Sequence, residues 1–199
     1  MNLTYNHWYF PSALPINMCD NIIKAGKAAR FNKATTGTNK RATAEVQKKR
    51  KSNVSWLNDK WIYDLIHPYI HTANRNAGWN FQWDWSESCQ FTIYKPGQFY
   101  DWHCDSWDRP YEKEGPQNGK IRKLSVTVSL SDPKDYTGGQ LEFKPINFNT
   151  GKQYTQVCKE ILPKGSICVF PSHMWHRVRP VKKGTRYSLV IWSCGWPFK

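Results

Sequence analysis

The feature that most constrains the fold is a change of pattern after Trp79. From there on, short β-rich runs alternate with Gly, Pro, Asn and Asp, a pattern typical of a sandwich or barrel. Strands are expected at residues 89–94, 102–105, 122–130, 140–143, 153–158, 166–170, 176–178 and 187–192. The second half of the chain is therefore predicted to be mainly β.

The first 80 residues carry helical patterns instead. Apolar residues recur near helical spacing from Pro15 to Arg30 and again from about Val54 to Tyr69, where Pro68 is expected to kink or end the helix. A chain of 199 residues with 39% hydrophobic content can bury a sizeable core. We predict one domain over residues 1–199, with 1–80 as a helical support region and 81–199 as the β core.

The composition predicts the cellular location of the protein and the state of its cysteines. No apolar run approaches the length of a membrane span, and the amino terminus lacks the basic-then-apolar pattern of a secretory signal, so a soluble cytoplasmic protein is expected. The cysteines contain no C-x-x-C pair, which indicates neither a zinc knuckle nor a disulfide framework and favours reduced thiols. They are Cys19, Cys89, Cys104, Cys158, Cys168 and Cys194.

Positive charge is concentrated in one segment. The formal net charge is +14, and ten basic residues but only one acid, Glu45, lie between Lys24 and Lys51. Such runs are usually solvated surfaces or mobile loops. The alternative is an acidic partner or substrate, including nucleic acid, because clustered Lys and Arg bind phosphates. The sequence leaves both interpretations open.

A group of metal-ligand residues follows in the β region. His103-x-Asp105 and a later histidine could form the triad of two histidines and one carboxylate that holds non-haem iron(II) with open coordination positions. In an extended strand, His103 and Asp105 share a face with Cα atoms about 7 Å apart, while Cys104 points away. His-x-Asp alone is common, and spacing cannot choose between His173 and His176 as the other histidine.

Alternation within two strands predicts a polar pocket. In residues 124–130 the aliphatic side chains share one face and the hydroxyl groups share the other. In the last strand, Arg186, Ser188, Val190 and Trp192 share a face, so Arg186 could point into the same cavity and bind the far end of a dicarboxylate. In a basic protein it could also simply pair with a surface carboxylate.

These motifs occur in the order found in the iron(II)/2-oxoglutarate-dependent dioxygenases. The segment from Phe91 to Trp192 resembles their prolyl 4-hydroxylase-like branch, which includes small bacterial and phage hydroxylases. The matching stretches are 94–105, 122–131, 138–143, 163–172, 176–181 and 184–192. The resemblance implies a mainly β fold with flanking α-helices, in which a double-stranded β-helix, or jelly-roll barrel, forms the catalytic core.

The resemblance also assigns roles to individual residues. It implies His103, Asp105 and His176 as the iron ligands and favours His176 over His173, because the family places its distal ligand just before a segment like 177–181. It implies Arg186 as the partner of the 2-oxoglutarate C5 carboxylate. Other implied co-substrate contacts are Tyr94, Thr127 or Ser129, and Trp192.

The implied reaction consumes 2-oxoglutarate and O2, releases succinate and CO2, and uses Fe(II), with ascorbate as reductant. Asp105 favours hydroxylation, since family members that halogenate lack this carboxylate. The favoured substrate is a prolyl residue in a peptide or protein. The alternatives are a dioxygenase acting on a free amino acid or nucleic acid, and a non-catalytic jelly-roll binding module.

The loop from Ser106 to Lys120 is long and polar and directly follows the metal motif. Loops on a rigid scaffold often close over substrate, so we hypothesise a substrate lid that carries Trp107, Arg109 and Tyr111. The alternative is a disordered connector.

Overall fold

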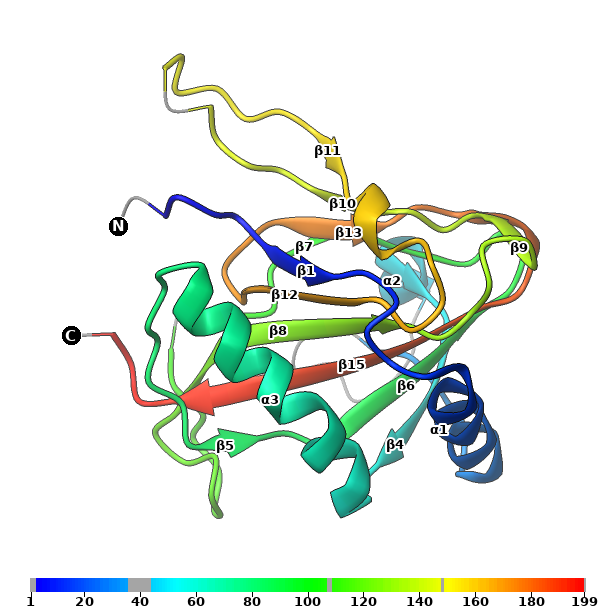
Figure 1. The fold of residues 1–199 in the computed structure, drawn as a ribbon, viewed down its shortest axis with the longest axis horizontal. Coiled ribbons are helices and arrows are strands. Elements are labelled where there is room, and N and C mark those ends of the chain that lie inside the picture. The colour runs from blue at the N-terminus through cyan, green and yellow to red at the C-terminus, as the bar shows by residue number, and fades with distance from the viewer. Residues whose placement is uncertain (1–2, 36–43, 107–108, 148, 199) are drawn as a thin grey trace.

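Two antiparallel sheets form the body of the protein, and the main helices lie outside the larger one (Figure 1). The computed structural model describes residues 3–35, 44–106, 109–147 and 149–198. The larger sheet has the order β1-β12-β8-β15-β6-β4-β2, with β5 paired to β15. Its strands are β1 (Trp8–Phe10), β2 (Asn32–Lys33), β4 (Asn53–Leu57), β5 (Trp85–Ser86), β6 (Cys89–Tyr94), β8 (Ile121–Ser129), β12 (Ile167–Pro171) and β15 (Arg186–Gly195).

The smaller sheet has the order β11-β10-β13-β7-β3. Its strands are β3 (Arg50–Lys51), β7 (Phe99–His103), β10 (Leu141–Phe143), β11 (Gln156–Val157) and β13 (His176–Val178). A separate pair joins β9 (Tyr136–Gly138) to β14 (Val181–Gly184). The helices are α1 (Ile16–Ala28), α2 (Ala44–Lys49) and α3 (Lys60–Asn76), with a 3-10 turn η1 (Lys159–Ile161). This is the expected mainly β, jelly-roll architecture with flanking helices.

The outer face of the larger sheet is apolar and forms the main core. The aliphatic residues of β8 and β15 pack in one cluster with the buried stripe of α3. Fully buried members are Leu124, Val126, Val128, Leu189, Ile191, Ile62, Ile66 and Ile70. The predicted separation of apolar and hydroxyl faces in residues 124–130 is confirmed.

The opposite face of the same sheet carries a buried inner polar strip. Register places Ser188 of β15 between Ser129 of β8 and Thr92 of β6, and Arg186 beside Tyr94. We define the strip as Gln90, Thr92, Ser125, Thr127, Ser129, Arg186 and Ser188, all of which are buried. Buried polar groups need polar partners, so this face is suited to enclose polar atoms rather than a second apolar core.

The predictions for the amino-terminal region were partly wrong. The first helix is confirmed as α1, but residues 53–57 form β4, paired antiparallel with β6, rather than the start of a helix. Pairing with the sheet overrides the local pattern, because an apolar run this short fits either period. Helix α3 also continues through Pro68, since buried Ile62, Ile66, Ile70 and Ala73 hold both halves against the sheet.

Most of the strands predicted after residue 88 are present in the structure. Strands β6 and β13 have the predicted bounds, and the others expected between residues 121 and 192 are present with shifted ends. The strand expected at 102–105 instead ends at His103, so Asp105 lies just beyond β7. Strands β1, β2, β3, β5, β9 and β14 and helix α2 were not predicted, because two to six residues carry too little periodicity.

All six cysteines are free thiols. Within the ranges that the structure describes, no helix has both the length and the apolar character needed to cross a membrane.

Gly26 gives a test of how tightly α1 packs. An added Cβ at this buried helical position would lie 2.3 Å from the Phe91 ring of β6. Gly26→Ala should gain about 1 kcal/mol of helix propensity but lose about 1–3 kcal/mol to overpacking, so we expect lower stability in urea unfolding. Lys24→Ala, exposed on the same helix, should change stability by less than about 0.5 kcal/mol. A Gly26→Ala protein as stable as this control would contradict the close contact.

Candidate active site

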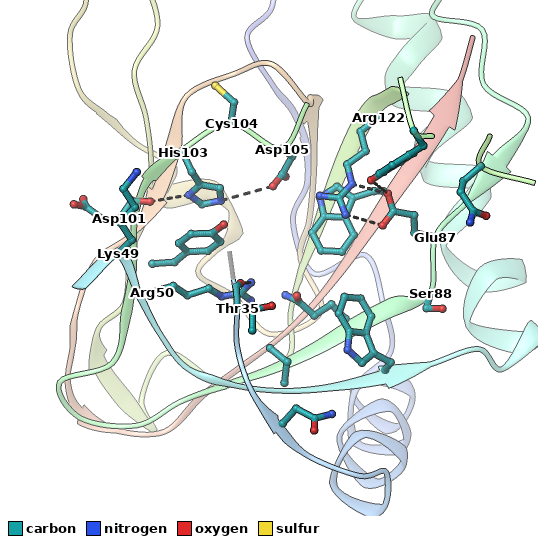
Figure 2. A pocket seen from close by; sticks show the side chains of 18 of the residues that line it. Thr35, Lys49, Arg50, Glu87, Ser88, Asp101, His103, Cys104, Asp105 and Arg122 are labelled. Carbon is teal, nitrogen blue, oxygen red and sulfur yellow. Dashed lines mark hydrogen bonds and ion pairs between the residues drawn. The ribbon is translucent and has the colours of Figure 1, made fainter. Parts of the chain in front are cut away.

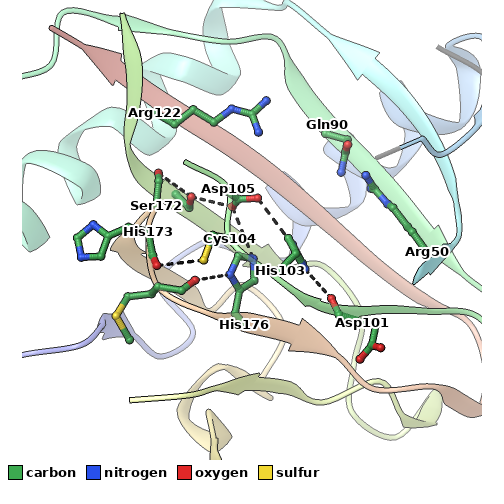
Figure 3. A network of polar contacts seen from close by, with 12 residues as sticks. Arg50, Gln90, Asp101, His103, Cys104, Asp105, Arg122, Ser172, His173 and His176 are labelled. Carbon is green, nitrogen blue, oxygen red and sulfur yellow. Dashed lines mark hydrogen bonds and ion pairs between the residues drawn. The ribbon is translucent and has the colours of Figure 1, made fainter. Parts of the chain in front are cut away.

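Strand pairing brings the two histidines of the predicted triad together. His103 ends β7, His176 begins β13, and the two are direct partners in the smaller sheet. Nε2 of His103 lies 3.7 Å from Oδ1 of Asp105, and Nε2 of His176 lies 3.6 Å from Oδ2 (Figure 3). The ligand atoms of all three residues lie within 4.8 Å of one another. We refer to His103, Asp105 and His176 as the triad.

Backbone carbonyls orient both imidazoles. Nδ1 of His103 is 2.7 Å from the carbonyl oxygen of Asp101, and Nδ1 of His176 is 2.9 Å from that of Met174. Each Nδ1–H therefore donates to a carbonyl, which leaves the Nε2 lone pair directed at the centre of the triad. Tyr100 stacks on His103 with ring centroids 3.4 Å apart. The rings are thus held as metal ligands require.

Asp105 is held by the larger sheet although it follows a strand of the smaller one. The hydroxyl of Ser125 in β8 donates to Oδ2 of Asp105 at 2.8 Å, and Ser172 Oγ lies 2.9 Å from Ser125 Oγ. The backbone N–H of Asp105 donates to the carbonyl of Ser172 at 2.9 Å. The carboxylate therefore bridges the two sheets in a defined orientation.

The electrostatics of the triad suit a divalent cation. Burial raises the pKa of Asp105, but His176, His103 and Arg122 outweigh it and bring the pKa to about 2. Burial, together with His176, lowers the pKa of His103 to about 3. At neutral pH the carboxylate is ionised and this imidazole is neutral, which is the protonation state that metal binding needs. The residues therefore fit a facially bound iron(II).

A cavity of about 1240 Å³ opens beside the triad (Figure 2). His103 and Asp105 lie in its wall, with Trp192 and Gln90 from the larger sheet. Other parts of the wall come from the basic segment, namely Lys33, Thr35, Lys49 and Arg50. Part of the positive charge of residues 24–51 therefore faces the cavity, while residues 36–43 lie outside the described residues.

Arg50 is a cavity residue that sequence reasoning missed. It is only 6% exposed, and its guanidinium carbon lies 4.4 Å from the Tyr100 ring centroid. Its Nε donates to Ser52 Oγ and its Nη1 to the carbonyl of Thr35. Its Nη2 is buried and has no hydrogen-bond partner among the described residues. A run of four basic residues cannot reveal which one the fold buries.

An ion pair fixes the opposite wall. Arg122 donates to Glu87 through Nε at 2.5 Å and Nη2 at 2.6 Å, and its guanidinium lies 3.9 Å from the Trp192 ring centroid. The Tyr111 hydroxyl donates to the same carboxylate at 2.7 Å. Residues 109–120 of the predicted lid are thereby tied to the cavity wall at Tyr111.

The predicted lid residues have different positions. Tyr111 lines the cavity, whereas Arg109 is exposed and is not part of the lining. Trp107 lies outside the described residues. A lid role for this loop stays a prediction.

The predicted co-substrate residues lie in or beside the inner polar strip. Arg186 is 3% exposed and donates through Nη1 to Ser188 Oγ at 3.2 Å, with its guanidinium carbon 5.5 Å from the Tyr94 ring centroid. Gly139, at φ +65°, leaves space for it, because an added Cβ would lie 3.0 Å from Arg186 Cδ. Of the five, Trp192 lines the large cavity, whereas Tyr94, Thr127, Ser129 and Arg186 do not.

His173 lies outside the triad. Its side chain is exposed, and its carbonyl accepts a hydrogen bond from Cys104 Sγ at 3.2 Å. The Cys104 side chain is engaged there rather than at the triad, as the alternation of an extended segment predicts.

The sequence is similar to a protein family and to individual proteins of known sequence. A family model described as the 2OG-Fe(II) oxygenase superfamily matches residues 89–194. A PKHD-type hydroxylase from Synechococcus sp. strain CC9902 is 40% identical over 97 residues, which cover 48% of this chain and 36% of that protein. The chain thus matches little more than a third of that relative's length.

Solved structures resemble the whole fold. The viral collagen prolyl hydroxylase of Paramecium bursaria Chlorella virus-1, in its 2OG complex, gives a TM-score of 0.66 at 20% identity, covering 96% of this chain and 97% of that one. A Trichoplax adhaerens prolyl hydroxylase, in complex with a hypoxia inducible factor peptide fragment, gives 0.69 at 18% identity, covering 96% and 84%. At these identities the likeness shows the shared fold.

Ser125 provides a test of how Asp105 is held. Ser125→Ala removes the hydroxyl that donates to Oδ2, and loss of such an outer hydrogen bond should weaken Fe(II) binding about 10- to 100-fold in anaerobic equilibrium dialysis. Ser55→Ala is a matched control, because Ser55 is also buried and donates one 2.8 Å bond, to the carbonyl of Gly26. Equal affinities in the two variants would show that Ser125 does not support the triad.

Proposed function

Because the chain belongs to the 2OG-Fe(II) oxygenase superfamily, we propose that it is an iron(II)- and 2-oxoglutarate-dependent dioxygenase that hydroxylates a prolyl residue in a peptide or protein. The observation that carries this proposal is the triad, of which His103 and Asp105 lie in the wall of a large cavity. Substrate, 2-oxoglutarate and O2 would give hydroxylated product, succinate and CO2. Ascorbate is the proposed reductant.

The triad residues would hold the metal through Nε2 of both histidines and the Asp105 carboxylate. The bound metal supplies the oxygen activation that couples 2-oxoglutarate decarboxylation to hydroxylation of a C–H bond. Ser125 and the two backbone carbonyls keep the ligands aligned and correctly protonated. The intact His103, Asp105 and His176 argue against a non-catalytic binding module.

Arg186 would bind the C5 carboxylate of 2-oxoglutarate. Its buried guanidinium forms no ion pair with an acid among the described residues. A buried charge without a counterion is costly, so the site favours a carboxylate ligand, which a guanidinium can bind through two hydrogen bonds. Tyr94, Thr127 and Ser129 would contribute polar contacts beside it, and Trp192 would form part of the wall.

The prolyl substrate is supported by the relatives. The curated relative is named as a PKHD-type hydroxylase, and the Trichoplax enzyme was solved with a peptide fragment. The cavity wall of this chain also carries Trp56, Trp175 and Tyr100, which offer apolar surface to a pyrrolidine ring.

The basic wall favours a substrate that also carries an acidic group. Arg50 Nη2 is buried without a partner among the residues described, and Lys33 and Lys49 lie in the same wall. An acidic residue beside the target proline would satisfy them. The carboxylate of a free amino acid would also pair with these basic groups, so a free amino acid is the second candidate substrate. A nucleic acid, through its phosphate, is the third.

The proposal is tested by succinate formation from 2-oxoglutarate with Fe(II), ascorbate and air, with and without proline-containing peptides. We expect peptides to stimulate turnover, and Asp105→Ala to reduce it by more than about 100-fold, because loss of a ligand exceeds the usual effect of an outer hydrogen bond. Asp64→Ala, an exposed aspartate of α3, is the control. Turnover that peptides do not stimulate would redirect the search to amino acids or nucleic acids, and none at all would indicate a binding module.

Arg50→Gln tests the acidic preference. Losing a hydrogen bond to a charged group costs about 1.5–3 kcal/mol, so the KM for a peptide with an acidic residue next to proline should rise at least about tenfold. The KM for 2-oxoglutarate and the turnover of a neutral peptide should change little. Lys24→Gln, exposed on α1, controls for total charge. A rise in the 2-oxoglutarate KM instead would place Arg50 at the co-substrate.

A further inference from the structure

A second cluster of metal-ligand side chains lies near the triad but is separate from it. His7, Cys158 and Glu160 each present one ligand atom, and these atoms lie within 4.8 Å of one another, the same limit that the triad meets. None of the three lines the large cavity. His7 stacks on Phe143 with ring centroids 4.8 Å apart, and the Phe143 centroid lies 6.3 Å from that of His176.

Two polar atoms of this cluster are buried without partners. Nδ1 of His7 and Oε2 of Glu160 form no hydrogen bond with any residue that the structure describes. They are two of the four such side-chain atoms in the described chain, and the other two belong to Arg50 and Trp192 of the cavity wall. Leaving a buried donor or acceptor unpaired is costly, so two such atoms together call for a ligand between them.

Cys168 of β12 packs in the same buried cluster as Cys158, outside the group of ligand atoms that lie within 4.8 Å of one another. Its side chain is fully buried, and Cys158 is itself 1% exposed. A bound cation would deprotonate both thiols, because the thiolate is the form that binds a metal.

We propose that His7, Cys158, Glu160 and Cys168 bind one zinc ion. Two thiolates, one imidazole and one carboxylate are a tetrahedral set that zinc prefers, and four protein ligands leave no position for a substrate. Ligand distances of about 2.0–2.3 Å place neighbouring ligand atoms about 3.3–3.8 Å apart. His7, Cys158 and Glu160 would therefore close by about 1 Å on binding, and Cys168 would move further to join them. Both thiol protons pass to solvent.

The site would join segments that are distant in the chain. His7 precedes β1, Cys158 and Glu160 flank the start of η1, and Cys168 lies in β12. Binding would fix the amino-terminal segment and η1 against the apolar cluster that contains Phe143 and Phe170, whose rings contact His176. The ion would thus be structural and would support the wall behind one iron ligand. This role is independent of the proposed hydroxylase activity.

Cobalt(II) distinguishes the two sites spectroscopically. Metal-free, reduced full-length protein is loaded with Co(II), and bound metal and near-ultraviolet absorption are measured together. A thiolate-to-cobalt charge-transfer band reports only a cysteine-ligated site, because the triad contains no thiolate. We expect two ions per chain and this band in wild type. Protein purified without added metal should contain zinc.

Variants assign the band to the cluster. Asp105→Ala should lose one ion and keep the band, whereas Cys158→Ser, Glu160→Gln and His7→Phe should each lose an ion and weaken or abolish the band. His7→Phe retains a ring to stack on Phe143, and Glu160→Gln keeps the side-chain shape, so neither depends on a large structural change. Cys104→Ser, which changes the thiol beside the triad, should keep the band.

Three outcomes would overturn the proposal. One is a wild type that binds a single Co(II) without the thiolate band. Another is a band that persists in Cys158→Ser. The third is a Cys158–Cys168 disulfide in the purified protein, detected by mass spectrometry after alkylation, because disulfide sulfurs cannot serve as thiolate ligands. The wild-type measurement decides the question even if a variant fails to fold.

Discussion

Strands β8 and β15 pair from Ser129–Ser188 to Ile121–Gly195, and their period-two alternation divides the protein. On one face of the larger sheet, aliphatic side chains pack against the helices. On the other face, hydroxyl groups and Arg186 point toward the smaller sheet. Because successive side chains point to opposite sides of a strand, a one-residue slip in this register would exchange the two environments. The apolar core and the polar interior are therefore consequences of the same pairing.

The triad depends on both sheets. Pairing of β7 with β13 sets His103 against His176, but Asp105 has already left its strand and is oriented by Ser125 of β8 and the backbone of Ser172. The spacing between the sheets thus decides whether three ligand atoms can meet around one ion. The three side chains of the triad are therefore positioned by strands of both sheets.

Buried or cavity-lining positive charge lies at two places in this fold. Lys33, Lys49 and Arg50 lie in the cavity wall beside the triad, whereas Lys24 is exposed on α1. Arg186 is buried elsewhere, next to Tyr94. Both buried guanidinium groups favour carboxylate ligands, which in the proposed function are the co-substrate for Arg186 and an acidic group of the substrate for Arg50. The second metal cluster adds a separate support for the same framework, at the junction of β1, η1 and β12.

The sequence by itself determined the mainly β architecture and the two faces of β8 and β15, because alternation is a local property of the chain. Residue spacing left His173 and His176 open, and only the resemblance to a family favoured His176. Tertiary structure alone decided that residues 53–57 join the sheet, that α3 continues through Pro68, and that Arg50 is buried. It also decided that His7 meets Cys158 and Glu160. These outcomes rest on contacts between segments far apart in sequence, which no local periodicity encodes.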